Sequence, residues 1–190
     1  MNSPSRDIAL SANPVVLVPV DASHLDGMWA AMAESATVLR GTMSWWRDEQ
    51  TKNDMAAWTS FTESAWHSGT LYAFSILDAA DERYLGACSL ENVDMNGLST
   101  NLSYWVRSSS TGRGIASGAA RRLALWAVNE LHLARVEITM VATNAASIAT
   151  ARKSGAAFEG CLRNKSRWSG ECYDMMVFSF VPQDFASLAS

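Results

Sequence analysis

The chain has 190 residues, 48% of them hydrophobic and 18% charged, and this balance predicts one folded domain rather than a disordered segment. The formal net charge is −4 and no long basic run occurs, which argues against a nucleic-acid-binding protein. No stretch of about 18 apolar residues indicates a membrane span, and the first ten residues lack the apolar core of a signal peptide. We therefore expect a cytoplasmic protein that does not bind membranes.

The three cysteines, Cys88, Cys161 and Cys172, are odd in number and lack the C-x-x-C spacing of zinc sites. The histidines are scattered along the chain. The sequence therefore predicts neither a disulfide framework nor a metal site.

Residues 1–13 are polar and are expected to form a flexible N-terminus, followed by a single domain over residues 14–185. The short apolar run 15–20 predicts a strand. Apolar residues spaced by three and four then predict one helix that begins at Asp21 and a second over about 47–67.

The remainder of the domain alternates between strand and helix patterns. The predicted strands are 71–77, 84–93, 102–106, 135–142, 157–162 and 173–181. The predicted helices are 115–131 and 145–153, and the polar segment 163–171 is expected to link the last two strands. This order predicts an α/β protein with one mixed sheet and helices on its faces.

The first informative motif lies between the strand that ends at Val106 and the following helix. A loop of small residues there closes with Thr111, Gly112, Arg113 and Gly114. Glycines let the backbone approach an anion, which then faces the unpaired N–H groups and the positive end of the helix. This pattern suits a pyrophosphate, although by itself it also fits an ordinary strand-to-helix turn.

Two other phosphate-binding patterns fit this loop less well. A Rossmann fingerprint requires G-x-G-x-x-G, and here the third glycine, Gly118, comes one residue late. The Walker pattern G-x-x-x-x-G-K-[ST] is absent. A nicotinamide-binding domain is therefore a disfavoured alternative.

The second motif follows the predicted strand 135–142. Asn144 and Ser147 open a short helix, and Lys153 and Gly155 lead to Phe158 on the next strand. Taken singly, Asn144 is a good helix cap and Ser147 an ordinary first-turn residue. The two motifs in this order carry much more information than either motif does alone.

Together the motifs resemble the GCN5-related N-acetyltransferase (GNAT) superfamily, and within it the RimJ/RimL type that acetylates the N-termini of ribosomal proteins. The first motif is similar to the family's G-x-G/A pyrophosphate loop, and the second to its N-x-x-S-x-x-x-x-x-K-x-G-(A)-x-F segment. The tail from Phe158 to Arg163, followed by Gly170 and Asp174, is similar to the RimL tail, whereas the match at residues 39–46 is looser. The resemblance covers about residues 15–182 and is firmest from 100 to 180.

This resemblance implies a GNAT fold, whose mixed and mostly antiparallel sheet is splayed between the fourth and fifth predicted strands, 102–106 and 135–142. It also implies acetyl-CoA as cosubstrate, with the pantetheine bonded to the backbone of Trp105 and Val106. The residues implied to hold the pyrophosphate are Thr111, Gly112, Arg113, Gly114, Ile115, Ala116 and Ser117. The acceptor amine would attack the thioester directly in a ternary complex.

The resemblance also suggests catalytic roles. Many relatives use a tyrosine in the second motif to protonate the departing thiolate, but no tyrosine stands between Asn144 and Phe158. RimL-like members have a serine in N-x-x-S, which maps onto Ser147, so we expect Ser147 to be the acid and Asn144 to bond the pantetheine or a water beside it.

The general base departs from the family pattern, because Ser166 stands where RimL-like tails have a carboxylate. We expect Glu91 to replace it, with a water chain from Glu91 or Asp94 to the amine. A solvated carboxylate at a strand end is the alternative role for Glu91. Ser109, in place of the usual Arg or Gln before the first glycine, removes one phosphate contact.

Eight tryptophans are many for a chain of this length. The tryptophans that fall in acceptor-cleft segments of relatives are Trp45, Trp46 and Trp168. Those at helical spacing, for which core packing is expected, are Trp29, Trp58 and Trp126. Aromatic walls in the cleft could hold an alkyl or aromatic amine or a peptide N-terminus.

The sequence thus predicts an acetyl-CoA-dependent N-acetyltransferase whose acceptor is a protein N-terminus, such as that of a ribosomal protein, or a small-molecule amine. The missing tyrosine and tail carboxylate leave open a non-catalytic acyl-CoA-binding module that senses or scaffolds. The oligomeric state also stays open, with a homodimer as one alternative.

Overall fold

The computed structural model describes residues 3–43, 45–168 and 170–188. Their sheet has eight strands in the order β1-β2-β3-β4-β5-β6-β8-β7. The strands are β1 (Leu10–Ala12), β2 (Val15–Pro19), β3 (Tyr72–Asp78), β4 (Tyr84–Asp94), β5 (Ser99–Val106), β6 (Arg135–Val141), β7 (Ala157–Trp168) and β8 (Glu171–Phe180). The helices are α1 (Leu25–Thr42), α2 (Lys52–Ser68), α3 (Ile115–Glu130) and α4 (Ala145–Ser154), with 3-10 turns η1 (Ala22–His24), η2 (Ser108–Ser110) and η3 (Pro182–Leu188).

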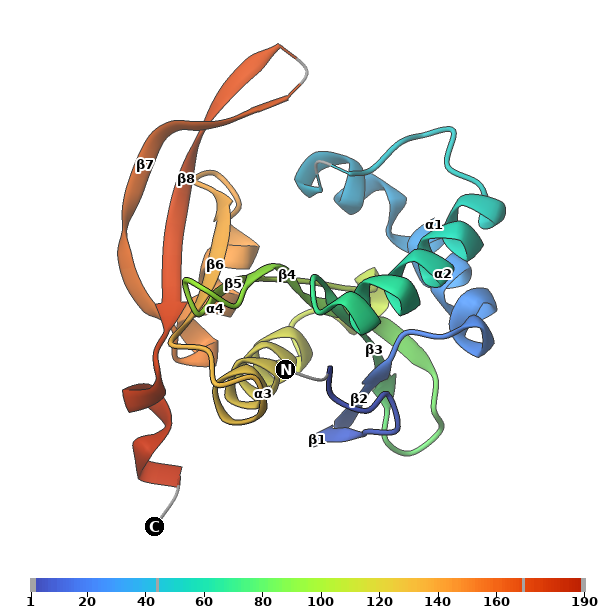
Figure 1. The fold of residues 1–190 in the computed structure, drawn as a ribbon. Coiled ribbons are helices and arrows are strands. Elements are labelled where there is room, and N and C mark those ends of the chain that lie inside the picture. Colours follow the sequence, from blue (N-terminus) through green and yellow to red (C-terminus); the bar gives the residue numbers. More distant parts are fainter. Residues whose placement is uncertain (1–2, 44, 169, 189–190) are drawn as a thin grey trace.

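Helices cover both faces of this sheet (Figure 1). On one face, α1 and the start of α2 bury a cluster that includes Met28, Met32 and Met55. On the other face, α3 packs Leu123 and Trp126 into the larger core. The α/β arrangement expected from the order of elements is therefore confirmed.

The sheet splays between β5 and β6, its one parallel pair among the described strands. Pairing runs only from Ser99 opposite Arg135 to Asn101 opposite Glu137 and then stops, although both strands continue. At the point of separation, Thr139 Oγ1 donates to Asn101 Oδ1 at 3.1 Å. The splay lies where the sequence placed it, between the strands that end at Val106 and Val141.

Helix α2 begins later than the predicted 47–67. Thr51 Oγ1 accepts from the backbone N–H of Asp54, and Asp54 Oδ2 accepts from the backbone N–H of Thr51 at 2.7 Å. This capping box starts the helix at Lys52 and leaves residues 45–51 outside it. That segment forms one wall of the site described below.

The two ends of the domain also differ from expectation. Within residues 1–13, expected to be flexible, β1 pairs with β2, and Trp66 Nε1 donates to Pro4 O at 2.8 Å. Near the C-terminus, the segment 163–171 is not a separate link, because β7 runs to Trp168 and pairs there with Glu171. This part of the β7–β8 hairpin extends beyond the body of the sheet (Figure 1), so its side chains cover no core. Its residues are therefore polar and lack the apolar pattern from which a strand is predicted.

Among the residues that the structure describes, none of the helices combines the length and the apolar character that crossing a bilayer requires.

Candidate functional site

The splay leaves one edge of β5 open. From Leu102 onward β5 pairs only with β4, so its other edge carries backbone groups without a strand partner. On the paired side, a Cβ on Gly86 would lie 2.1 Å from Trp105 O, so only glycine permits this close approach. An extended chain such as pantetheine can hydrogen-bond along the open edge beside Trp105 and Val106.

The predicted pyrophosphate loop has the backbone that its glycines suggested. Gly112 and Gly114 adopt φ of +75° and +79°, and Gly114 is the N-cap of α3. The side chains of Ile115 and Ser117 are buried, and Ser117 Oγ donates to Gly114 O at 2.9 Å. The first-turn N–H groups of α3 therefore face the loop side of the helix, where they can bind an anion.

Lys153 also reaches this loop, a role that the sequence did not assign to it. Its Nζ lies 3.3 Å from where a Cβ on Gly114 would be, so α4 delivers an ammonium group to the start of α3. Thr111 and Arg113 are exposed on the same turn. Two cations and a helix N-terminus thus converge on one loop, which fits a diphosphate.

Helix α1 holds the beginning of the same loop. Glu34 accepts from Arg107 Nε at 3.0 Å and from Arg107 Nη2, and its other oxygen accepts from Ser109 N at 2.7 Å. Ser35 Oγ accepts from Ser108 N at 3.0 Å. The bond to Arg107, followed by that to Ser109, lowers the pKa of Glu34 to about 2. We call these five residues the α1 clamp; it could not be predicted from local sequence, because its two halves are 73 to 75 positions apart.

Replacing Glu34 by Gln should loosen the loop and raise the KM for acetyl-CoA about two- to fivefold. Glu159→Gln is the matched control, because Glu159 forms a similar pair with Arg135 away from the loop and its pKa is also lowered to about 2. A carboxylate with a lowered pKa stabilises the fold above its ordinary pKa of 4.5, and this contribution is lost as the pH falls towards 2. Both variants should therefore have a lower Tm than the original protein at neutral pH, and this difference in Tm should disappear in acid. Only Glu34→Gln should change the KM for acetyl-CoA.

A tyrosine from another strand lies beside the second motif. Asn144 caps α4, accepting from Ser147 N at 3.0 Å, as its simpler predicted role requires. Tyr104, from β5, donates its hydroxyl to Ser147 O at 3.0 Å and lies 3.1 Å from Ser147 Oγ. Burial raises the pKa of Tyr104 to about 12, so the phenol stays protonated. The tyrosine that the motif lacks thus arrives from another strand, which spacing within the motif could not reveal.

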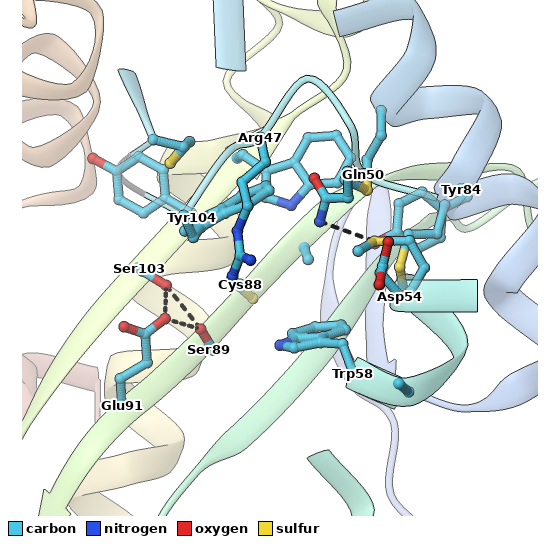
Figure 2. A pocket seen from close by; sticks show the side chains of 18 of the residues that line it. Arg47, Gln50, Asp54, Trp58, Tyr84, Cys88, Ser89, Glu91, Ser103 and Tyr104 are labelled. Carbon is cyan, nitrogen blue, oxygen red and sulfur yellow. Dashed lines mark hydrogen bonds between the residues drawn. The ribbon is translucent and has the colours of Figure 1, made fainter. Parts of the chain in front are cut away.

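A cavity of about 710 Å³ lies on the α1–α2 face of β4 and β5. Its lining residues come from α1, residues 43–50, α2, β4 and β5, and it reaches Ser103, Tyr104 and Trp105 on the splayed strand. Figure 2 shows Arg47 pointing into it from above, with Trp58 and Glu91 on the opposite side. Its size suits a small organic molecule or the end of a peptide.

Glu91 lies in this cavity with two serines. Ser89 Oγ donates to Glu91 Oε1 at 2.8 Å, Ser103 Oγ donates to the same oxygen, and the two hydroxyls are 2.8 Å apart (Figure 2). The described residues give Oε2 no hydrogen bond, so it can accept one from an amine or a water. Asp94, the other predicted candidate, instead accepts from Asn96 N in the following turn and does not line the cavity.

The tryptophans divide differently from the prediction. Trp45 lines the cavity, whereas Trp46 packs behind it and donates to Asp48 at 3.0 Å. Trp126 is a core residue as expected, but Trp58, also assigned to the core, lines the cavity as well. Trp105 contributes its ring to the same wall. The side chain of Trp168 lies outside the described residues.

Within the described part of the chain, no three His, Cys, Asp or Glu side chains converge to hold a metal ion.

Comparison with known proteins gives a family match and a close structural likeness. The acetyltransferase (GNAT) domain matches residues 15–157. "Probable N-acetyltransferase YjcK" of Bacillus subtilis is 30% identical over 114 residues, which are 60% of this chain and 63% of the relative. The curated relatives are matched over 57% to 66% of their own length.

Two solved structures illustrate the likeness in fold. An acetyltransferase from Salmonella typhimurium, described as modifying the N-terminal serine of ribosomal protein L7/L12, has a TM-score of 0.83 at 17% identity, covering 92% of this chain and 99% of that one. RimJ of Mycobacterium smegmatis, in complex with a CoA disulfide, has a TM-score of 0.82 at 21% identity, covering 94% and 86%.

Proposed function

We propose, from the premise that this chain belongs to the acetyltransferase (GNAT) family, that it is an N-acetyltransferase moving acetyl from acetyl-CoA to a primary amine. The observation that carries the proposal is the meeting of two features at Tyr104 and Trp105. An open strand edge leading to an anion-binding loop lies on one side of β5, and a cavity with a carboxylate lies on the other. This arrangement suits one donor and one acceptor bound together.

The residues present fit acetyl-CoA. The α3 N-terminus, Arg113 and Lys153 would bind its diphosphate, and the backbone of Trp105 and Val106 would bind its pantetheine. Its thioester supplies an activated acetyl group. Asn144 already uses its amide oxygen to cap α4, so its amide nitrogen is the group left to bond pantetheine or a water.

The chemical step needs a neutral amine and a protonated leaving sulfur. Glu91, oriented by Ser89 and Ser103, takes the proton from the amine, directly or through a water, as the C–N bond forms. Ser147 gives its proton to the sulfur as the C–S bond breaks, Tyr104 replaces that proton through the 3.1 Å contact, and Tyr104 regains a proton from solvent when the products leave. A backbone N–H near Val106 would stabilise the charge on the carbonyl oxygen.

The activity described for the Salmonella typhimurium neighbour favours an N-terminal α-amine as acceptor, including that of a ribosomal protein. A small-molecule amine is the second candidate, favoured by the enclosed apolar walls of the cavity. The test is release of CoA thiol from acetyl-CoA with peptides of ribosomal N-terminal sequence and with small amines. Tight binding of acetyl-CoA without turnover of any amine would contradict the enzyme and indicate a non-catalytic module.

Removing the proposed acid should slow the chemical step. Ser147→Ala should lower kcat about 10- to 100-fold with the KM for acetyl-CoA nearly unchanged. Tyr104→Phe should lower kcat less, and the double variant should be no slower than Ser147→Ala, because the two hydroxyls act in series. Ser154→Ala is the control, because Ser154 is on the same helix and its hydroxyl donates to Ala151 O. Multiplying effects in the double variant would show that Tyr104 and Ser147 act independently.

A further inference from the structure

One end of the acceptor cavity is apolar. Its walls there are formed by methionines and aromatic rings, with Met28, Met32, Met43, Met55, Trp45 and Trp58 among them. Met28, Met32 and Met55 are each at most 5% exposed, so this end lies in the interior between α1 and α2. Methionines adapt to irregular apolar groups, and this surface therefore suits a bulky hydrocarbon or aromatic ring.

Two residues that line the same cavity each carry a buried polar atom without a hydrogen bond to any described residue. The two atoms are Gln50 Oε1, an acceptor, and Tyr84 Oη, a donor. Buried polar atoms are nearly always paired, so an unpaired one in a cavity indicates a group that a ligand or water satisfies. Here both kinds of atom are present, one able to accept and one able to donate.

Gln50 is held with its oxygen free. Its Nε2 donates to Met55 Sδ at 3.8 Å (Figure 2), so the nitrogen end of the amide already has a partner. Gln50 belongs to the segment before α2 that the Thr51–Asp54 capping box excludes from the helix. The local fold therefore presents this amide to the cavity.

Tyr84 is equally constrained. Helix α1 presses against it, because a Cβ on Gly27 would lie 2.8 Å from Tyr84 Cβ. Burial raises the pKa of Tyr84 far above its ordinary value, so the phenol is neutral and keeps its proton. The nearby Ser75 hydroxyl is bonded to His24 Nδ1 at 2.9 Å; it also interacts with Tyr84 and lowers that pKa slightly, but the two hydroxyls do not reach hydrogen-bond geometry.

We propose that the acceptor amine carries an apolar body, such as an aromatic ring, ending in a neutral group that donates to Gln50 and accepts from Tyr84. A hydroxyl has this chemistry, and a phenol on a short alkylamine combines it with the apolar body. The amine would lie at Glu91 and the ring among the methionines. This proposal rests on the acetyltransferase function proposed above and names the class of its acceptor.

An anionic tip is the less favourable alternative. An anionic group would be drawn to Arg47, which is exposed, forms no ion pair with a described residue and points into the cavity (Figure 2). Near Gln50 and Tyr84, by contrast, an anion would lose its hydration, would face the Asp54 carboxylate that lines the same cavity, and would find only neutral partners in the amide and the phenol. The neutral tip is therefore the form that the buried atoms select.

The experiment compares two amines that differ only in the hydroxyl, tyramine and phenethylamine, with acetyl-CoA and the full chain. A second arm compares hexapeptides that begin with Tyr or Phe, to separate a small molecule from a protein N-terminus as the source of the amine. In at least one of these two pairs, we expect the compound with the hydroxyl to have a kcat/KM at least about tenfold higher than the compound without it. The compound without the hydroxyl leaves Gln50 Oε1 and Tyr84 Oη unpaired. Equal values in both pairs would overturn the proposal while leaving the acetyltransferase function in place.

Two variants locate the effect. Gln50→Met and Tyr84→Phe should each reduce the preference for the hydroxyl about threefold or more, and together to near one. Tyr72→Phe is the matched control, since Tyr72 is also buried but packs against Trp66 in the other cluster, and it should keep the preference. A preference that persists in the double variant would overturn the assignment. If no amine is acetylated, the proposed function fails, and calorimetric titration with tyramine and phenethylamine tests the inference alone.

Discussion

Gly112→Glu should reduce the affinity for acetyl-CoA at least about 100-fold. The side chain would place a carboxylate on the turn where the α3 N-terminus, Arg113 and Lys153 converge, and like charges held close together cost several kcal/mol. Nothing lies within 4 Å of the new Cβ, so the loss would arise from charge at the loop rather than from a clash. Isothermal titration with acetyl-CoA measures it directly.

The positive φ of Gly112 makes any side chain there strained, and the control must carry the same strain. Gly170→Glu does so, because Gly170 has φ of +83° and open space around it in the turn between β7 and β8. Both variants should lose similar stability, and only Gly112→Glu should lose the cosubstrate. An equal loss of affinity in Gly170→Glu would mean that the diphosphate is not held at this loop.

Glu91→Gln should lower kcat about 100- to 1000-fold with little change in the KM for acetyl-CoA. The amide keeps the shape of the carboxylate and can still accept from Ser89 and Ser103, but it cannot take a proton from the amine. Steady-state thiol release at saturating acetyl-CoA gives the comparison.

Asp94→Asn is the control for this change. Asp94 lies three residues further along β4 and accepts from Asn96 N in a turn outside the cavity, so its loss should leave kcat within about twofold of the original value. If Asp94→Asn were the slow variant and Glu91→Gln the active one, the proton would leave through the turn and the role given to Glu91 would be wrong.

Most elements of the fold could be predicted because their signals are local. A nearly continuous apolar run marked β3 and alternating apolar residues marked β6. Gly155 marked the end of α4, and Gly114 the start of α3. The misassigned boundaries depended on other signals. The start of α2 depended on a two-residue cap, and the distal β7–β8 hairpin on backbone pairing between polar residues, whose pattern carries no hydrophobic periodicity.

The candidate site divides in the same way. The local backbone at Gly112 and Gly114 and the helix position of Ser147 could be predicted, because the turn and the helix start depend on neighbouring residues. Tyr104 beside Ser147 and Glu34 beside Ser109 join positions 43 and 75 apart, and only the sheet order brings them together. Trp58 was assigned to the core from its spacing, but spacing alone cannot separate a residue facing the core from one facing a cavity beside it.

The α1 clamp has a consequence for how the two substrates bind. Helix α1 carries Met28 and Met32 in the cavity wall and, less than one turn after Met32, Glu34 and Ser35, which bond the loop that leads to the proposed diphosphate site. A rigid helix that touches both sites transmits any shift made at one of them to the other. By thermodynamic reciprocity, the factor by which a bound amine changes the affinity for the cosubstrate equals the factor by which the cosubstrate changes the affinity for the amine.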